Sequence, residues 1–368
     1  MRIFLTLLLT THGLIHLMGF VKAFKLAEVQ QLTHTISKPA GVFWLLAALL
    51  FIVAAALVAL KGASWWIPAV PALVLSQILI FLFWSDAKFG SIANALVLLP
   101  LFIAVMGSFP SSFSNVFKRE VQKGLQRSTT PPIVREEDLA HLPKQVQKYL
   151  HVAGTVGKPG VQNVHVRCKG QIRTKVDGDW MDFTSDQYNF LDDPSRLYFI
   201  ESSLYGIPFQ GLHMYIGPNA IMQIKFASMF LVVDAKGPEM NKSETVTLFN
   251  DMCVLMPAVL IDRSIQWEEV DSLTVRAKFT NAGNAITATL SFNEHGELIN
   301  FSSDDRYQSS DGKTYKQYRW TTPMKNYRDF GGMNLASHGE ATWHTPEGEL
   351  VYAKMTIELV EYNCGEFH

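Results

Sequence analysis

The first third of the chain alternates long hydrophobic runs with short polar segments. Four runs lie at about residues 3–20, 41–60, 65–84 and 91–107. Each is close to the ~20 residues that a helix needs to cross ~30 Å of hydrocarbon. Lysine and tryptophan side chains mark their ends, among them Lys22, Lys61 and Trp84, as is typical of membrane boundaries. The pattern predicts about four transmembrane helices over residues 1–110, surrounded by lipid bilayer.

The start of the chain and the orientation each leave an alternative open. Arg2 followed by an apolar stretch resembles a cleavable signal peptide, but no A-x-A-like site follows and the apolar pattern continues to Phe20. A literal positive-inside count slightly favours a cytoplasmic C-terminal domain. Discounting the basic residues between 118 and 127, which open the soluble domain, favours the opposite side. We expect the domain to lie outside the cytoplasm.

After residue 108 the composition changes from apolar to polar. Ser-, basic- and Pro-rich residues over 111–132, including Ser128, Thr129 and Thr130, predict a linker with a short amphipathic helix. Acidic residues at 136–138 precede apolar residues at helical spacing up to Leu150, so a helix is expected that Pro143 kinks or subdivides.

From Val161 onward the period becomes that of strands. Runs rich in β-branched and aromatic residues alternate with Gly-, Asn-, Asp- and Pro-containing turns, which predicts a soluble domain over 133–368 with roughly ten strands joined by hairpins. An antiparallel sheet of that size must curl, split or close. The expected fold is an α-helical transmembrane bundle plus a large antiparallel β domain, a curved sheet or half-barrel wrapped on one helix.

That single helix is predicted between residues 243 and 260, where apolar side chains recur every three or four positions. Its apolar face includes Phe249, Met252 and Met256. A curved sheet around one helix can leave an apolar cavity, so these three residues are candidate ligand-binding residues. The alternative is that they fill the core.

His12 and His16 are spaced to share one face of the first predicted span. Polar groups inside a membrane are costly and usually functional. The pair can ligate a metal or haem, relay protons, or hydrogen-bond within the bundle beside Thr10, Thr11 and Asn94. The sequence offers no second intramembrane histidine pair for a bis-histidine haem.

Composition argues against several functions. A formal net charge of −1 and the absence of a basic stripe argue against nucleic acid as a partner. Cys168, Cys253 and Cys364 have no zinc or redox spacing, although a disulfide between the first two is compatible with an extracytoplasmic domain. We expect no cofactor.

Catalysis has little support in the sequence. No G-x-S-x-G, H-E-x-x-H, Walker or Rossmann motif is present. One polar group, consisting of Arg328, His338, Glu340 and His344 near Trp343, is scattered along predicted strands. We therefore interpret the protein as non-catalytic, and these side chains as sheet-stabilising or surface groups rather than a polar site.

Residues 117–363 carry a set of motifs that goes beyond the local pattern. The set comprises Phe117-Lys118-Arg119-Glu120-Val121, Leu142-Pro143, Tyr149-Leu150, Gly154, Gly157-Lys158-Pro159, Trp180, Phe183, Gln187-Tyr188, Gly237-Pro238-Glu239, Trp267, Tyr327-Arg328-x-Phe330-Gly331-Gly332, Gly339-Glu340-x-x-Trp343 and Glu361-Tyr362-Asn363. With these motifs the chain resembles an uncharacterised bacterial family of membrane-anchored domains of unknown function.

The resemblance implies a bacterial protein with its domain outside the cytoplasm, although family members look like one-span proteins and this chain has four predicted spans. At the level of architecture, the sheet around one helix is also similar to the lipoprotein-carrier fold of bacterial envelopes, whose half-open barrels hold acyl chains.

Three functions remain. The first is a multi-pass protein of the bacterial inner membrane whose extracytoplasmic β domain binds an apolar or lipid-like ligand or serves envelope assembly. The second is a membrane redox or transport protein that uses His12 and His16. The third is a structural or protein-interaction module. The sequence identifies no protein partner.

Overall fold

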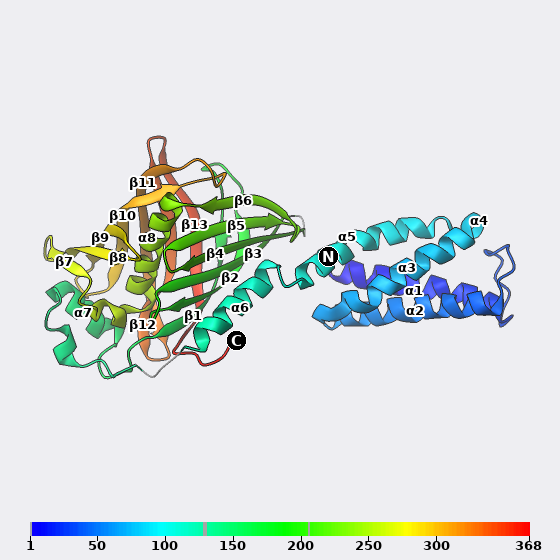
Figure 1. Cartoon of the computed structure of the whole chain (residues 1–368), viewed down its shortest axis with the longest axis horizontal. Helices are drawn as coiled ribbons and strands as arrows, with labels where there is room; N and C mark the ends of the chain where they lie inside the picture. Colours follow the sequence, from blue (N-terminus) through cyan, green and yellow to red (C-terminus); the bar gives the residue numbers. More distant parts are fainter. Residues whose placement is uncertain (1, 128–130, 205–206) are drawn as a thin grey trace. The chain divides into compact units, whose positions relative to one another are not determined.

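The computed structural model describes residues 2–127, 131–204 and 207–368. It divides into two compact units, Met1–Phe109 and Pro110–His368 (Figure 1). The predicted linker over 111–132 includes residues 128–130, which lie outside the described residues, as Met1 does.

In its described part the first unit consists of helices and short connections. The helices are α1 (Arg2–Ala23), α2 (Lys38–Ala59), the 3₁₀ turn η1 (Ala63–Trp65), α3 (Trp66–Leu82), α4 (Trp84–Ala87) and α5 (Gly90–Ser108). Ser37 shows how one begins: its hydroxyl accepts a hydrogen bond from the Ala40 amide, and a proline occupies the first turn of α2.

Four helices in the described chain are long and apolar enough to cross a membrane: Arg2–Ala23, Lys38–Ala59, Ala63–Leu82 and Gly90–Leu125. The last of these ranges includes α5 together with the following helix. Large apolar side chains stand outward on all four, for example Leu7, Leu49, Phe81 and Leu96, which are at least 50% exposed. Outward apolar side chains are what a lipid environment requires, so the unit fits a membrane bundle.

The second unit is built on a sheet of thirteen strands within the described residues. The strands are β1 (Asn163–Ile172), β2 (Met181–Phe190), β3 (Ser195–Leu204), β4 (Ile207–Ile216), β5 (Asn219–Phe226), β6 (Phe230–Lys236), β7 (Gln266–Glu269), β8 (Thr274–Asn281), β9 (Asn284–Phe292), β10 (Leu298–Gln308), β11 (Lys316–Phe330), β12 (Met333–Thr345) and β13 (Gly348–Tyr362).

The spatial order is β6-β5-β4-β3-β2-β1-β13-β12-β11-β10-β9-β8-β7, and every pair is antiparallel. Two runs of consecutive hairpins therefore meet where β1 pairs with β13. Sheets of this size curl rather than stay flat, and here strands from both ends of the sheet approach the same helix. The predicted large, curled antiparallel sheet is confirmed, with thirteen strands instead of about ten.

The second unit also has five helical segments in its described part. They are α6 (Phe113–Leu125), the 3₁₀ turn η2 (Glu136–Leu139), α7 (Lys144–Ala153), α8 (Pro238–Leu255) and the 3₁₀ turn η3 (Pro257–Ile261). The helix predicted around residues 136–150 is thus divided. Pro143 stands at the N-terminal boundary of α7, where the missing N–H of proline costs no helical hydrogen bond.

The helices α6 and α8 pack on opposite faces of the sheet. Phe113, Phe117, Val121 and Leu125 of α6 form one buried face against β2, β3 and β4. Close approach requires Gly124, because a Cβ atom there would lie 2.4 Å from the Phe190 ring. The helix lies inside the predicted linker, yet it belongs to the packed part of the domain.

On the other face, α8 contacts β5 and β6 from one end of the sheet and β8, β9 and β10 from the other (Figure 1). All but a few of its residues are buried. Since α8 is enclosed on more than one side, its polar side chains also face protein. All three cysteines are free thiols, so the disulfide considered between Cys168 and Cys253 is not formed.

Candidate functional site

The first candidate site is the histidine pair of α1. His12 and His16 are 3% and 2% exposed, and their ring centroids lie 4.7 Å apart. The Nε2 atom of His12 lies 2.9 Å from Asn94 Oδ1, which also accepts a hydrogen bond from Ser76 at 3.1 Å. Asn94 in turn donates to Gln77 at 3.0 Å. The network joins α1, α3 and α5 without any formally charged group.

A backbone hydrogen bond indicates which ring nitrogen of His16 carries the proton. His16 Nδ1 lies 2.9 Å from the carbonyl oxygen of His12, and a carbonyl oxygen only accepts, so Nδ1 donates. In the neutral ring His16 Nε2 then carries a lone pair, and this buried atom has no hydrogen-bond partner among the described residues. The same holds for the Nε1 donor of Trp44, whose ring centroid lies 5.1 Å from that of His16.

The apolar side of α8 carries the three residues predicted to bind a ligand. Phe249, Met252 and Met256 are 0%, 3% and 0% exposed. Phe249 stacks on Phe279 of β8 at 4.8 Å and lies 6.0 Å from Phe301 of β10. In this structure the three side chains touch other core residues.

The opposite side of α8 is polar and equally buried. Glu244 and Asp251, at helical positions i and i+7, both reach Arg196 of β3. The distances are 3.3 Å from Arg196 to Glu244 and 2.7 Å to Asp251. Gln187 and Asn189 of β2 donate to the same Asp251 oxygen at 2.8 and 3.1 Å. The buried Arg196 guanidinium thus pairs with two carboxylates, and the side-chain amides of Gln187 and Asn189 provide further hydrogen bonds to Asp251.

A second arginine lies beside this group. Ser243 Oγ accepts a hydrogen bond from the Tyr307 amide at 2.9 Å, so the first turns of α8 lie against the end of β10. Arg306, the neighbour of Tyr307, stacks on Trp320 at 4.2 Å and donates to the Tyr352 hydroxyl at 3.1 Å. We call Arg196, Glu244, Asp251 and Arg306 the charge cluster.

Two polar atoms at the charge cluster remain without hydrogen-bond partners in the described chain: Glu244 Oε1 and Arg306 Nε. His213 Nδ1 of β4 lies 3.8 Å from Glu244 Oε1, too far for a hydrogen bond. A buried polar atom without a partner costs free energy. Within the described residues the cluster therefore leaves one acceptor, Glu244 Oε1, and one donor, Arg306 Nε–H, unsatisfied.

The pKa values follow from these surroundings. Burial acts to raise the pKa of Glu244, but the positive charge of Arg196, with contributions from His213 and Arg306, outweighs it and lowers that pKa to about 2. For His213, burial outweighs the nearby Glu244 carboxylate and lowers the pKa. Burial acts to lower the pKa of Arg196, but Asp251 and Glu244 raise it overall. At neutral pH Glu244 and Arg196 are charged, and His213 is neutral.

An apolar strip adjoins the charge cluster on the same sheet face. Every second side chain of β3, counted from Arg196, lies on the face on which α8 packs. The residues that pair with these positions across β4, β5 and β6 lie on the same face. Six apolar members of this set are half-buried, and two of them, Met222 and Val233, also pack against the core of the domain. We call the six the apolar strip: Ile200, Phe209, Met222, Ile224, Phe226 and Val233.

The strip and the cluster meet at two aromatic side chains. Tyr198 pairs with His213 across β3 and β4, and their rings are 5.6 Å apart. His213 pairs in turn with Met222 of the strip. A half-open apolar surface thus leads to a buried polar end, an arrangement that suits an amphiphile.

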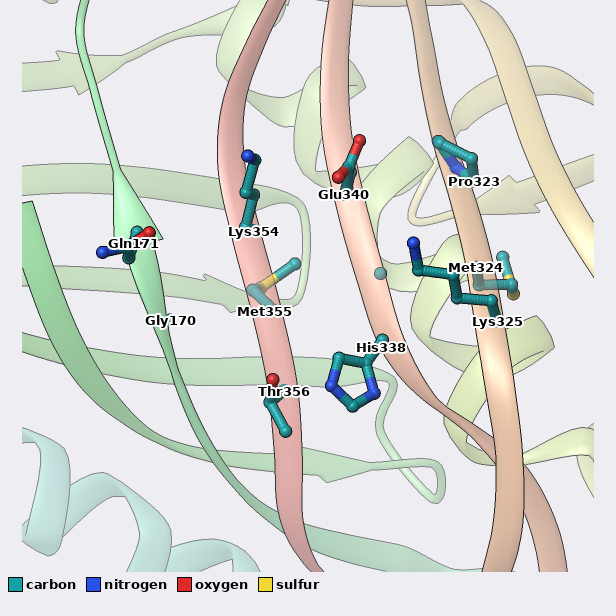
Figure 2. A pocket seen from close by; sticks show the side chains of 11 residues that line it. Gly170, Gln171, Pro323, Met324, Lys325, His338, Glu340, Lys354, Met355 and Thr356 are labelled. Atoms are coloured by element: carbon teal, nitrogen blue, oxygen red, sulfur yellow. The ribbon is translucent and has the colours of Figure 1, made fainter. Parts of the chain in front are cut away.

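The opposite sheet face has a shallow hollow of about 350 Å³ over β1, β13, β12 and β11 (Figure 2). His338 and Glu340, two of the polar residues considered from sequence, line it with Lys325 and Lys354. Its mixed charges and open shape do not form a defined polar site. Within the described residues no group of three or more His, Cys, Asp or Glu side chains is placed to hold a metal.

The other two members of that polar group lie elsewhere. Arg328 donates to the Ile357 carbonyl at 2.6 Å, and the His344 ring lies 2.9 Å from the Thr321 hydroxyl. The sequence brought these four residues together only by proximity along the chain. It missed the charge cluster, although Glu244, Thr247 and Asp251 form a visible polar stripe opposite Phe249 on the predicted helix.

The fold and these sites define a β domain on a chain with four candidate membrane helices. Residues 132–355 match a family described as a family of unknown function, DUF6544, and the chain belongs to this family. The resemblance predicted from the motifs is thereby confirmed. No curated protein matches the chain.

Two solved structures are similar in fold. A DUF1329 family protein from Desulfovibrio piger is 11% identical, with a TM-score of 0.36, and the match covers 61% of this chain and 93% of that one. A LolA superfamily protein from Nitrosomonas europaea is 10% identical, with a TM-score of 0.33 and coverage of 59% and 93%. Similarity at this level says nothing about a ligand.

Proposed function

We propose that this protein is a multi-pass membrane protein whose β domain, outside the cytoplasm, binds a lipid-like ligand on the apolar strip, in transport or assembly of the cell envelope. The observation that carries the proposal is the strip itself. Apolar side chains that are gathered on one face of four strands and remain partly exposed are typical of a binding surface. The candidate spans would tether the domain to a bilayer, the natural source of acyl chains.

Photo-crosslinking tests the proposal on the full chain in amphipol. The probe is a fatty-acid methyl ester with a diazirine in its chain, and the labelled peptides are mapped by mass spectrometry. We expect adducts on β3 to β6. Ile224→Asp places a charge in the strip and should reduce them at least ~10-fold, since burying an unpaired carboxylate is costly.

Ile221→Asp is the matched control, because Ile221 is a half-buried isoleucine of the same strand on the other face of the sheet. It should retain the adducts. Labelling confined to the helical unit, or equal loss in both variants, would contradict the proposal.

One observation favours a second candidate, a redox or transport function of the bundle. The lone pair of His16 Nε2 is buried, unpartnered and held by the backbone bond at Nδ1, which is how metal-binding histidines are commonly oriented. A Soret band or stoichiometric metal in the purified full chain, lost in His12→Ala and His16→Ala, would support this function. A metal-free, colourless preparation from cells supplied with iron and haem would count against it.

A further inference from the structure

One carboxylate of the charge cluster, that of Glu244, uses only one of its two oxygens for hydrogen bonding in the described chain. Glu244 is 1% exposed, and its Oε1 atom has no hydrogen-bond partner in the described chain, while Oε2 binds Arg196. An ionised carboxylate oxygen needs a donor. Among the described residues no donor lies at hydrogen-bond distance from it, and His213 Nδ1 is 3.8 Å away.

The complementary deficiency lies on β10. Arg306 uses one terminal nitrogen for Tyr352 and its flat face for Trp320 and Trp343, but its buried Nε–H donates to nothing in the described chain. Since Ser243 and Tyr307 are hydrogen-bonded, the residues next to them in sequence, Glu244 and Arg306, start from adjoining backbone positions. One group with a donor and an acceptor can satisfy both.

The charge of the cluster restricts that group further. Two guanidinium groups and two carboxylates make it up, so its formal charges cancel. An added carboxylate or phosphate would bring an uncompensated charge into a buried site, which is unfavourable. An uncharged group with a hydroxyl, by contrast, donates to the carboxylate through its hydrogen and accepts from the guanidinium through its oxygen.

We infer that the ligand is an uncharged, hydroxyl-bearing acyl lipid, of the acylglycerol type, whose head lies between Glu244 and Arg306 while its chain follows the apolar strip. The inference rests on the proposed function for the chain-binding part. It adds the class of the head and the two residues that recognise it.

Competition against the diazirine methyl ester on the wild-type full chain tests the inference. Monooleoylglycerol, methyl oleate and sodium oleate are compared as competitors for labelling of β3 to β6. We expect monooleoylglycerol to compete at a concentration at least ~10-fold lower than methyl oleate, because it adds hydrogen bonds to charged groups. Oleate should have no such advantage.

Variants locate the effect. Glu244→Gln should reduce the ratio between the two neutral competitors to below ~3-fold, because the hydrogen bond to a full charge is lost. Labelling by the ester itself and near-UV circular dichroism report whether the strip is still folded. Arg306→Lys, which removes Nε–H and keeps the charge, provides the same test if Glu244→Gln does not fold. Glu268→Gln, in the exposed part of β7, is the control and should keep the full ratio.

Each outcome has a distinct meaning. If the wild type is not labelled on β3 to β6, the proposed function fails and the inference fails with it. If labelling occurs but monooleoylglycerol and methyl oleate compete equally, only the inference fails. Stronger competition by oleate than by monooleoylglycerol, or an unchanged ratio in a folded Glu244→Gln protein, would also overturn it.

Discussion

The helical unit and the β domain each bury a polar network around one helix, but the two networks differ in charge. In the helical unit the network of His12, Ser76, Gln77 and Asn94 has no formally charged member. In the β domain the network around α8 contains two arginines and two carboxylates. Desolvating an ion is far more costly than desolvating an amide, so charges are found where close counter-charges offset that cost.

The two networks are expected to tolerate substitutions differently. Removing one ion from a compensated group leaves another ion buried and unpaired, whereas removing one neutral partner leaves only an unsatisfied dipole. We therefore expect substitutions in the β domain to be several times more damaging than those in the bundle.

The largest effect is expected for Arg196→Leu. It leaves Glu244 and Asp251 without their shared counter-charge and should lower the free energy of unfolding by ~3–5 kcal/mol, measured by guanidinium unfolding of the full chain in detergent with near-UV circular dichroism. Arg276→Leu removes an exposed partner of Glu268, and less than ~1 kcal/mol is expected. Similar losses in both variants would show that the charge cluster stabilises the fold no more than an exposed ion pair does.

Acid should weaken the β domain through Glu244. Its pKa is about 2 in the folded protein and about 4.5 unfolded, so its stabilisation is complete above pH 4.5 and disappears as pH falls toward 2. The loss should be roughly 3 kcal/mol, while protonation of His213, whose pKa is also lowered, adds a separate loss that begins below pH 6.5.

The measurement is the free energy of unfolding against pH. Glu244→Gln should flatten the curve between pH 4.5 and 2, and Glu239→Gln, in the first turn of the same helix, should not. A wild-type curve that is already flat in this range would contradict the assigned surroundings of Glu244.

A smaller effect is expected in the bundle. Asn94→Leu removes the acceptor shared by His12 and Ser76 and should cost ~1 kcal/mol in SDS-induced unfolding of the full chain. Thr11→Val, at an exposed position of α1, is the control and should be nearly neutral. A cost of several kcal/mol for Asn94→Leu would mean that the network is charged after all.

The smallest effect is expected for His16→Leu. This histidine donates one hydrogen bond to a backbone carbonyl and leaves its other nitrogen unpaired, so an apolar residue of similar size should change stability by no more than ~0.5 kcal/mol. A stability-neutral variant that abolishes a spectroscopic or transport signal would separate function from packing at this position.

The sequence predicted the features that depend on neighbouring residues, but not those that depend on residues far apart in the chain. The apolar face of α8, the division at Pro143 and the hairpins are visible as spacing and turn residues, because they depend on neighbours in the chain. The partner of Glu244 is not, since Arg196 comes from a strand 48 residues away and faces α8 only through the register of β3. The four-residue β7 is likewise too short to produce a recognisable alternation.

The pairing of β1 with β13 has a consequence for how the domain forms. Val164 pairs with Tyr362, about 200 residues later in the chain, while all other strand pairs in the described residues join sequence neighbours. Closing so long a loop costs entropy that local hairpins do not. Each half of the sheet can therefore begin to form during synthesis, but the seam can close only after the last strand has left the ribosome. Until then both halves expose unpaired strand edges, and a chain shortened before β13 would keep them exposed permanently.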